Sequence, residues 1–307
     1  MIKITERDKA VIRYINRFGF IKKKYLFDKF KEKETSDIQC IRKRLNKLKD
    51  EKYLYSFGQT YGLAVKGREL LYELNEEMHY EKTDEKVKRN LAEAHEVLYL
   101  FGNENIKSRI EILESGELKN KDSNRAKLFL GEMTIENGYR YIVYKIKKSS
   151  PISYIKKVIS DIRNYGFTNV IIAVENKYHM IKLKEFNIYS AGLKSCIIVP
   201  FSDEGIEKVN VLRNGYFSDE YMMKVIEKLN PEVRGREIYV NGIRTFNMLR
   251  FDAVEENIMI AEVSKDRLET YNIISFKDNA EYFNSVYRNA HIATLSFSKF
   301  KEKICNI

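Results

Sequence analysis

The stretch that decides the fold is TSDIQCIRKRLNKLKDEKYLYSFGQTYGLAVKG, residues 35–67. Its first part predicts a helix, because aliphatic residues recur at helical spacing and define one apolar face: Ile38, Ile41, Leu45 and Leu48. The opposite face carries hydroxyl, amide and cationic groups: Ser36, Gln39, Lys43, Asn46 and Lys47, with Arg42 and Arg44 on its flanks. Positive charge suits phosphates and amides suit base edges, so this face is a candidate nucleic-acid reader.

The second part of the stretch predicts two short strands around a tight turn, followed by a new helix. Gly58 supplies the permissive backbone position of the turn. Gln59, Thr60 and Tyr61 follow it and are expected to approach a sugar-phosphate edge. A basic, amide-rich helix followed by a hairpin is the order of a winged helix-turn-helix, with the hairpin as the wing. A solvated basic helix on an ordinary surface is the alternative explanation.

Two helices are expected upstream of this stretch. Thr5 and Asp8 form a capping-box-like start for the first helix, and Gly19 stands at its C-cap. The second helix runs from about Lys22 to Lys31, and the lysines at its start, Lys22, Lys23 and Lys24, are candidates to clamp phosphate. Three helices and a hairpin within about 65 residues fit a compact tri-helical core.

The positive charge is concentrated at the N-terminal end. Of the 55 Lys+Arg and 44 Asp+Glu, residues 1–75 hold 19 and 10, which is +9 of the net +11; the remaining 36 and 34 leave +2. A basic unit on a nearly neutral remainder is typical of a binding head on a separate body.

The composition and motifs exclude several other classes of protein. No apolar run approaches the roughly 20 residues that span a bilayer, and residues 1–11 contain no signal-peptide core, so we expect no membrane contact. Three cysteines far apart (Cys40, Cys196 and Cys305) predict a reduced cytoplasmic protein. No P-loop, GxGxxG, HExxH or Cys-rich zinc pattern occurs, and we therefore expect no cofactor and no metal.

The domain organisation follows from shifts in pattern. Residues 76–84 are polar and aperiodic, and we place a boundary there, between a head at 1–75 and a linker at 76–125. This segment contains an amphipathic helix at about 84–101, which is a linker, a dimerisation element or the first helix of the next domain. We expect its histidine, His95, to be packed or partly buried and not a ligand. Residues 126–307 alternate strands and helices, with buried strands at 169–175 and 195–201, and further strands at 236–240, 243–249, 257–263 and 271–276. The predicted class is therefore α+β, with a mixed α/β body for dimerisation or partner contact.

The N-terminal third resembles a known family. The segments TERDKAVIRYINRFGFIKKKYLFDKF (5–30), IRKRLNKLKDEKYLYSF (41–57) and YGLAVKGRELL (61–71) are similar to the plasmid replication-relaxation family, and NLAEAHEVLYLFG (90–102) is similar to its next helix. These are winged-helix proteins of plasmids, phages and conjugative elements. The resemblance covers about residues 4–101 and implies a role in plasmid replication or its control.

The same resemblance implies a restriction-endonuclease-like region further along the chain, a fold that holds a divalent metal on paired carboxylates. The corresponding tripeptide here is Val143-Tyr144-Lys145, with valine in place of the acid, and the preceding strand offers only Glu132. We therefore expect a degenerate scaffold without nuclease chemistry. A second acid set, Asp252 and Glu262 with Lys265, keeps a metal-dependent nuclease open as an alternative.

From the sequence we thus expect a non-enzymatic, sequence-specific double-stranded DNA-binding protein of a mobile element. Its expected partners are DNA, a second copy of the chain, and replication or segregation proteins. A transcriptional regulator, and a basic head that contacts another protein, are the remaining alternatives. The residues expected to contact DNA are Gln39, Arg42, Lys43, Arg44, Asn46, Lys47, Lys22, Lys23, Lys24, Gln59, Thr60 and Tyr61.

Overall fold

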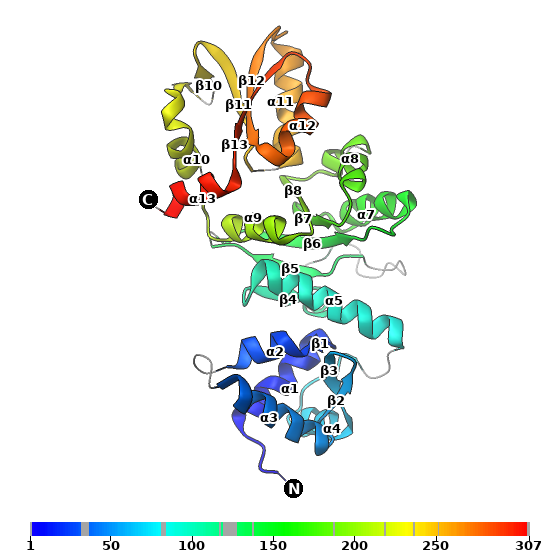
Figure 1. The fold of residues 1–307 in the computed structure, drawn as a ribbon. Helices are drawn as coiled ribbons and strands as arrows, with labels where there is room; N and C mark the ends of the chain where they lie inside the picture. The colour runs from blue at the N-terminus through cyan, green and yellow to red at the C-terminus, as the bar shows by residue number, and fades with distance from the viewer. Residues whose placement is uncertain are drawn as a thin grey trace. The chain divides into compact units, whose positions relative to one another are not determined.

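The fold is described from a computed structural model, which confirms the mixed α+β class with several sheets (Figure 1). It describes residues 2–31, 37–80, 84–116, 118, 128–136, 138–186, 188–217, 219–235, 237–250 and 252–305. The chain divides into two compact units, Met1–Ser123 with Phe129–Met133 and Asn124–Leu128 with Thr134–Ile307. None of the described helices combines the length and the apolarity that a bilayer span requires.

The first unit begins with short helices and strands that alternate along the chain. They are α1 (Glu6–Phe18), β1 (Ile21–Lys22), α2 (Lys23–Phe30), α3 (Asp37–Asp50), β2 (Leu54–Phe57), β3 (Thr60–Leu63) and α4 (Val65–Glu73). The expected capping box is present, since Thr5 and Asp8 bond each other's backbone N–H groups. Gly19 ends α1 with a φ of +82°, a conformation that favours glycine.

The three strands form one antiparallel sheet in the order β1-β3-β2. Phe57 lies opposite Thr60 at the turn, and Ile21 lies opposite Tyr61 on the other side of β3. The core beneath is aliphatic, with these side chains at most 1% exposed: Val11, Ile12, Ile15, Leu26, Ile41, Leu45, Leu48, Leu54 and Leu71. The apolar face of α3 is thus buried as expected from Ile41 onward.

Ile38 is the exception to that expectation, because 37% of it is exposed. The helix begins at Asp37, so Ile38 lies in the first turn, at the margin of the core. Residues 32–36, including Ser36, lie outside the described residues.

The first unit continues beyond the boundary expected at 76–84. It includes α5 (Glu85–Gly102), β4 (Ile106–Ser108), α6 (Arg109–Glu114) and the first three residues of β5 (Gly131–Thr134), which pairs antiparallel with β4. His95 of α5 is 1% exposed, as the sequence predicts, and its Nε2 lies 2.9 Å from the hydroxyl of Tyr14 on α1. The helix expected in a linker is therefore packed on α1, because its apolar stripe is covered there.

The second unit contains three parallel strands connected by helices. In chain order its first elements are β6 (Arg140–Ile146), α7 (Ile152–Tyr165), β7 (Asn169–Val174), α8 (Lys177–Glu185), η1 (Ile188–Ala191), β8 (Ser195–Pro200) and α9 (Asp203–Arg213). Strand β7 pairs in parallel with β6 on one side and with β8 on the other. The buried strands that the sequence predicts are confirmed.

A second sheet follows in the order β13-β12-β11-β10-β9, parallel between β11 and β13 and antiparallel at the other edge. The elements are α10 (Asp219–Ile226), η2 (Glu227–Leu229), β9 (Glu232–Arg234), β10 (Glu237–Val240), β11 (Ile243–Asn247), α11 (Ala253–Lys265), β12 (Tyr271–Phe276), α12 (Lys277–Val286), β13 (Ala290–Leu295) and α13 (Phe297–Cys305). The turn at Asn241-Gly242, between β10 and β11, has the positive φ values of a tight hairpin, 53° and 75°.

The strand expected at 257–263 is wrong, because this segment lies within helix α11. Asp252 caps the helix by accepting a hydrogen bond from the backbone N–H of Val254, and Glu255 and Glu256 follow in the first turn. Alanine, glutamate and methionine favour a helix once it has begun, and they outweigh the isoleucines that favour a strand. A short apolar run does not by itself distinguish the two structures.

Candidate nucleic-acid interface

The solvent face of α3 presents a row of polar and cationic side chains. Each of the following is exposed: Gln39, Arg42, Lys43, Asn46 and Lys47. They follow the helical repeat on the side opposite Ile41, Leu45 and Leu48, which are buried. The tertiary core therefore fixes which side of α3 faces outward.

Three cations on this face, Arg42, Lys43 and Lys47, form no ion pair with a described residue. The guanidinium of Arg42 lies over the ring of Phe27 on α2, 5.4 Å from its centroid, which orients it beside the row. All three charges are therefore available to an anionic partner.

Arg44, expected on the same face, is instead part of the structural core of the first unit. Its Nε donates to Oδ1 of Asp8 at 2.8 Å, and its Nη2 donates to Oδ2 of Asp8 and to the carbonyl of Lys3. Asp8 is 1% exposed. Burial disfavours the charge on Asp8, but the bonds from Arg44 and Thr5 together outweigh it and lower the pKa of the Asp8 carboxyl. Contact with DNA would compete with this pair, which corrects the expectation for Arg44.

The hairpin residues differ in their availability. Gln59 is exposed at the turn, and a Cβ added at Gly58 would meet no atom within 4 Å, so the tip of the hairpin is open. Thr60 and Tyr61 are buried, which corrects the expectation that both approach a backbone edge. The Thr60 hydroxyl donates to the carbonyl of Phe57, and the Tyr61 hydroxyl donates to Oδ1 of Asn46.

Tyr61 therefore helps to orient the solvent face of α3, because its hydroxyl is hydrogen-bonded to the Asn46 amide at 3.1 Å. On the same ring lies the ammonium of Lys23, 5.1 Å from the centroid. A reader side chain held by a second residue loses less conformational entropy on binding than a free one.

The lysines at the start of α2 are partly neutralised within the first unit. Lys22 pairs with Glu96 of α5, and Lys24 lies 3.5 Å from the same carboxylate. Burial raises the pKa of Glu96, but hydrogen bonds from Lys22 and Tyr25 outweigh it, so the net pKa is lowered. The phosphate clamp expected from Lys22 and Lys24 is thus opposed by an acid that lies outside residues 1–75.

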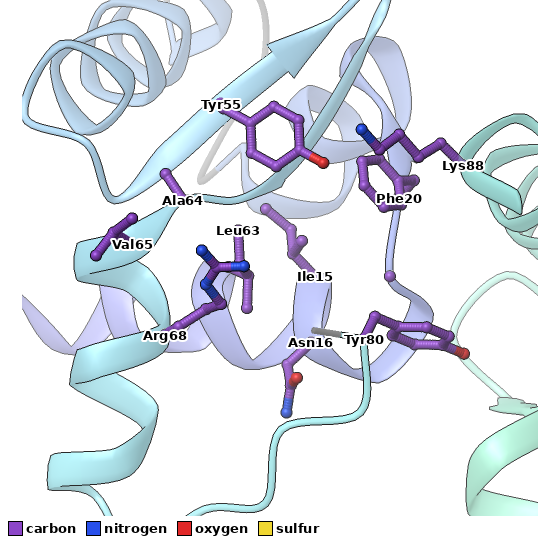
Figure 2. A pocket seen from close by; sticks show the side chains of 11 residues that line it. Ile15, Asn16, Phe20, Tyr55, Leu63, Ala64, Val65, Arg68, Tyr80 and Lys88 are labelled. Atoms are coloured by element: carbon purple, nitrogen blue, oxygen red, sulfur yellow. The ribbon is translucent and has the colours of Figure 1, made fainter. Parts of the chain in front are cut away.

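A cavity of about 470 Å³, which the sequence did not predict, lies behind the hairpin (Figure 2). Ile15, Phe20 and Leu63 form part of its wall. Lys88 of α5 lies over the rings of Tyr55 and Phe57, 5.4 Å from each centroid, and so connects α5 to strand β2.

The residues considered for a nuclease do not assemble into a metal site. Asp252 is the N-cap of α11, whereas Glu262 lies ten residues further along the same helix, which is about 15 Å at 1.5 Å per residue. The Asp252 carboxylate accepts hydrogen bonds from the Ser195 hydroxyl and the Cys196 backbone, and Glu262 pairs with Arg244 at 2.7 Å. These acids hold the second unit together.

Lys145, in the tripeptide that carries valine in place of the acid, also has a structural role. Its ammonium lies 2.7 Å from the carboxylate of Glu175 and 4.0 Å from the centroid of the Phe201 ring. Val143 is fully buried on the same strand. The buried lysine of this strand is therefore paired with an exposed carboxylate that follows β7, where a nuclease would hold its metal.

No protein-family model matches the chain, and no curated protein or solved structure matches it either.

Proposed function

We propose that this chain is a sequence-specific double-stranded DNA-binding protein of a plasmid or other mobile element, acting in replication or its control. In this proposal, α1 to β3 form a winged helix-turn-helix. Helix α3 enters the major groove and the β2–β3 turn contacts the neighbouring backbone. The second unit serves dimerisation or contact with replication or segregation proteins.

The observation that carries the proposal is the solvent face of α3. It combines Lys43 and Lys47, both without counterions in the described chain, with the amides of Gln39 and Asn46. Cations on the flanks of a groove neutralise phosphates, and amides between them pair with base edges. The buried Tyr61 also orients the Asn46 amide through a hydrogen bond. An orientation of this kind favours a binding face over an ordinary solvated helix surface.

The mobile-element assignment depends on the sequence resemblance over residues 4–101. Its test is fluorescence anisotropy of the intact protein on DNA pools from its own genetic neighbourhood, titrated with salt. We expect one duplex to be preferred, with an affinity that falls steeply as salt rises. Equal, weak binding to every duplex would contradict a sequence-specific reader and favour a purely electrostatic head.

The double substitution Lys43→Ala plus Lys47→Ala tests which face reads the DNA. We expect DNA binding to weaken at least about tenfold, and the slope of log affinity against log salt to decrease in magnitude by about two, one for each lost phosphate contact. Anisotropy at several salt concentrations measures both quantities.

The matched control is Lys157→Ala plus Lys265→Ala, which removes the same charge from two exposed helical lysines of the second unit. An equal loss of affinity in the control would show that net charge alone is responsible. An unchanged affinity in the folded α3 variant would rule out this helix as the reader.

A further inference from the structure

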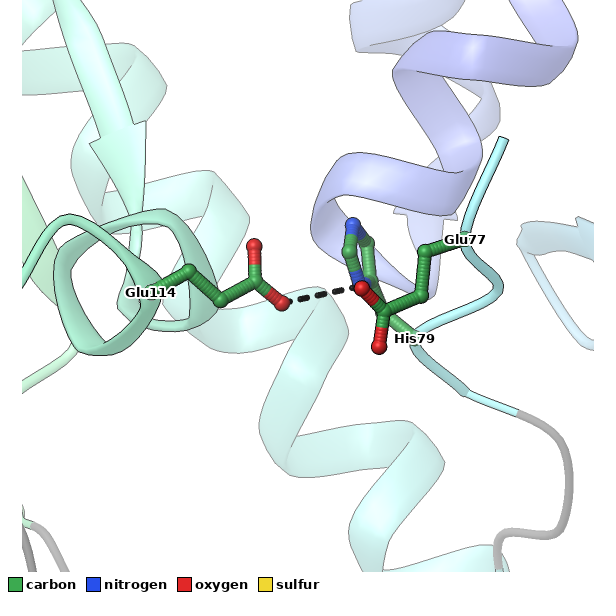
Figure 3. Close-up of side chains that lie close together, drawn as sticks. All are labelled: Glu77, His79 and Glu114. Carbon is green, nitrogen blue, oxygen red and sulfur yellow. Dashed lines mark ion pairs between the residues drawn. The ribbon is translucent and has the colours of Figure 1, made fainter. Parts of the chain in front are cut away.

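The first unit contains a cluster of potential metal ligands from two segments that are far apart in the sequence and close together in the fold. Glu77 and His79 lie in the segment that follows α4, and Glu114 is the last residue of α6, 35 positions after His79. Figure 3 shows the Glu114 carboxylate extending from α6 toward the imidazole of His79, with the Glu77 carboxylate beside it. Within the described residues, this is the one group of three such side chains whose donor atoms all lie within 4.8 Å of one another.

The separation of two of the donor atoms fits a small cation, and the third donor lies within 4.8 Å of both. Nδ1 of His79 lies 3.3 Å from Oε1 of Glu114. Ligands at 2.0–2.2 Å from a common ion are separated from each other by about 2.8–3.6 Å in octahedral or tetrahedral geometry. The imidazole side chain is 15% exposed and the Glu114 side chain 47% exposed, so the histidine is held while the glutamate has room to adjust.

The fold prepares the first half of the cluster through Asn16 of α1, which is 6% exposed. Its amide donates to the carbonyl of Glu77 at 2.8 Å, and its Oδ1 accepts the backbone N–H of His79 at 3.3 Å. The buried Asn16 side chain is thus hydrogen-bonded to the backbone of both Glu77 and His79. These bonds matter because residues 76–80 belong to no helix or strand.

The second half is fixed by the next residue of α1. Arg17 forms an ion pair with Glu111 of α6 and donates to the carbonyl of Ile106, at the start of β4. Glu111 also completes the capping box of α6 with Ser108. Neighbouring residues of α1 therefore position the two segments that carry the ligands, a support typical of built metal sites.

We propose that Glu77, His79 and Glu114 bind a first-row divalent cation of the zinc class. Two carboxylates supply a charge of −2 and the imidazole supplies a nitrogen ligand, a set that Zn²⁺ and its neighbours accept and that Mg²⁺ and Ca²⁺, which take oxygen ligands, do not favour. Three protein ligands leave at least one position for water. The bound ion would join the segment after α4 to α6 and so tie the α3-bearing half of the unit to its α5–α6 half.

The test is calorimetric titration of the untagged, chelator-treated full-length protein with ZnCl₂, with and without each ligand. We expect one Zn²⁺ per chain, and at least about a tenfold loss of affinity in each of Glu77→Gln, His79→Gln and Glu114→Gln. The matched control is Glu73→Gln, which removes an exposed carboxylate four residues before Glu77. It should bind Zn²⁺ as the parent does.

Thermal unfolding supplies a second readout that requires no DNA, so failure here and failure of the DNA-binding proposal remain distinct. Zn²⁺ should raise the unfolding temperature of the parent and of Glu73→Gln but not of the three ligand variants. Absence of Zn²⁺ binding to the parent, or binding that Glu73→Gln weakens as much as His79→Gln does, would overturn the proposal. In that case the cluster is a close contact between the side chains of His79 and Glu114 and not a metal site.

Discussion

Arg44→Ala is expected to lower the free energy of unfolding by about 2–3 kcal/mol, because it leaves the Asp8 carboxylate buried without its main partner. This loss is smaller than the usual cost of breaking a fully buried pair, since the Arg44 side chain is 27% exposed. Asp8 keeps its bonds to Thr5 and so remains a cap for α1. Urea unfolding at neutral pH measures the loss.

The matched control is Arg42→Ala, two residues away on the same helix. Arg42 is exposed and its guanidinium lies over the Phe27 ring, a contact whose loss costs at most about 1 kcal/mol. Arg44→Lys keeps the charge but not the planar fork, so its stability should fall between the parent and Arg44→Ala. If Arg44→Ala and Arg42→Ala unfold at the same urea concentration, the ion pair between Arg44 and Asp8 does not contribute to the free energy of unfolding.

This pair of arginines shows where prediction from sequence succeeds and where it stops. Helical spacing identified the buried face of α3 from Ile41 to Leu48, because periodicity is a local property of the chain. It did not distinguish Arg44 from Arg42, since both flank that face. The difference is set by Asp8, 36 residues earlier, and appears only when α1 and α3 are brought together.

The same limit applies to the hairpin and to the lysines of α2. Turn residues predicted the hairpin correctly, but not that Tyr61 points inward to hold Asn46. The charge count over residues 1–75 treated Lys22 as available, although Glu96, outside that range, neutralises it. Local pattern therefore predicts elements, whereas the availability of a side chain depends on a distant partner.

The predicted boundary at residues 76–84 does not coincide with the division between the two units, for a related reason. Polar residues 76–84 interrupt the helical periodicity, so the sequence placed α5 in a linker. What assigns α5 to the first unit is its inner face: Tyr25 donates to Glu96, Tyr99 donates to Asp28, and His95 meets Tyr14. Those contacts join α5 to α1 and α2 across about 70 to 80 residues of sequence, which no single-sequence pattern records.

His95 should make the first unit sensitive to acid. Its ring is enclosed by Phe18, Tyr25 and Tyr99, and its Nε2 meets the Tyr14 hydroxyl. Burial lowers the pKa of His95 from 6.5 to about 3; neighbouring Glu96 opposes this shift and Arg17 adds to it. A protonated ring would also need an acceptor at Nδ1, and no described residue provides one.

The sign of the effect follows from proton binding. Between pH 6.5 and about 3 the unfolded chain binds a proton at His95 that the folded chain does not, so stability falls as the pH falls through this window. Relative to pH 7, the loss from this residue is about 2 kcal/mol at pH 5 and about 3 kcal/mol at pH 4.

Comparison with His95→Gln isolates this contribution, because glutamine can still form a hydrogen bond with the Tyr14 hydroxyl but does not titrate. Urea unfolding of both proteins from pH 7 to pH 4 should give a stability difference that shifts in favour of His95→Gln by those amounts. Any loss of packing in the variant lowers its free energy of unfolding by the same amount at every pH, so it leaves the pH dependence of the difference unchanged. Parallel pH profiles for the two proteins would mean that His95 takes up its proton in the folded state, and that α1, α2 and α5 leave the ring accessible to water.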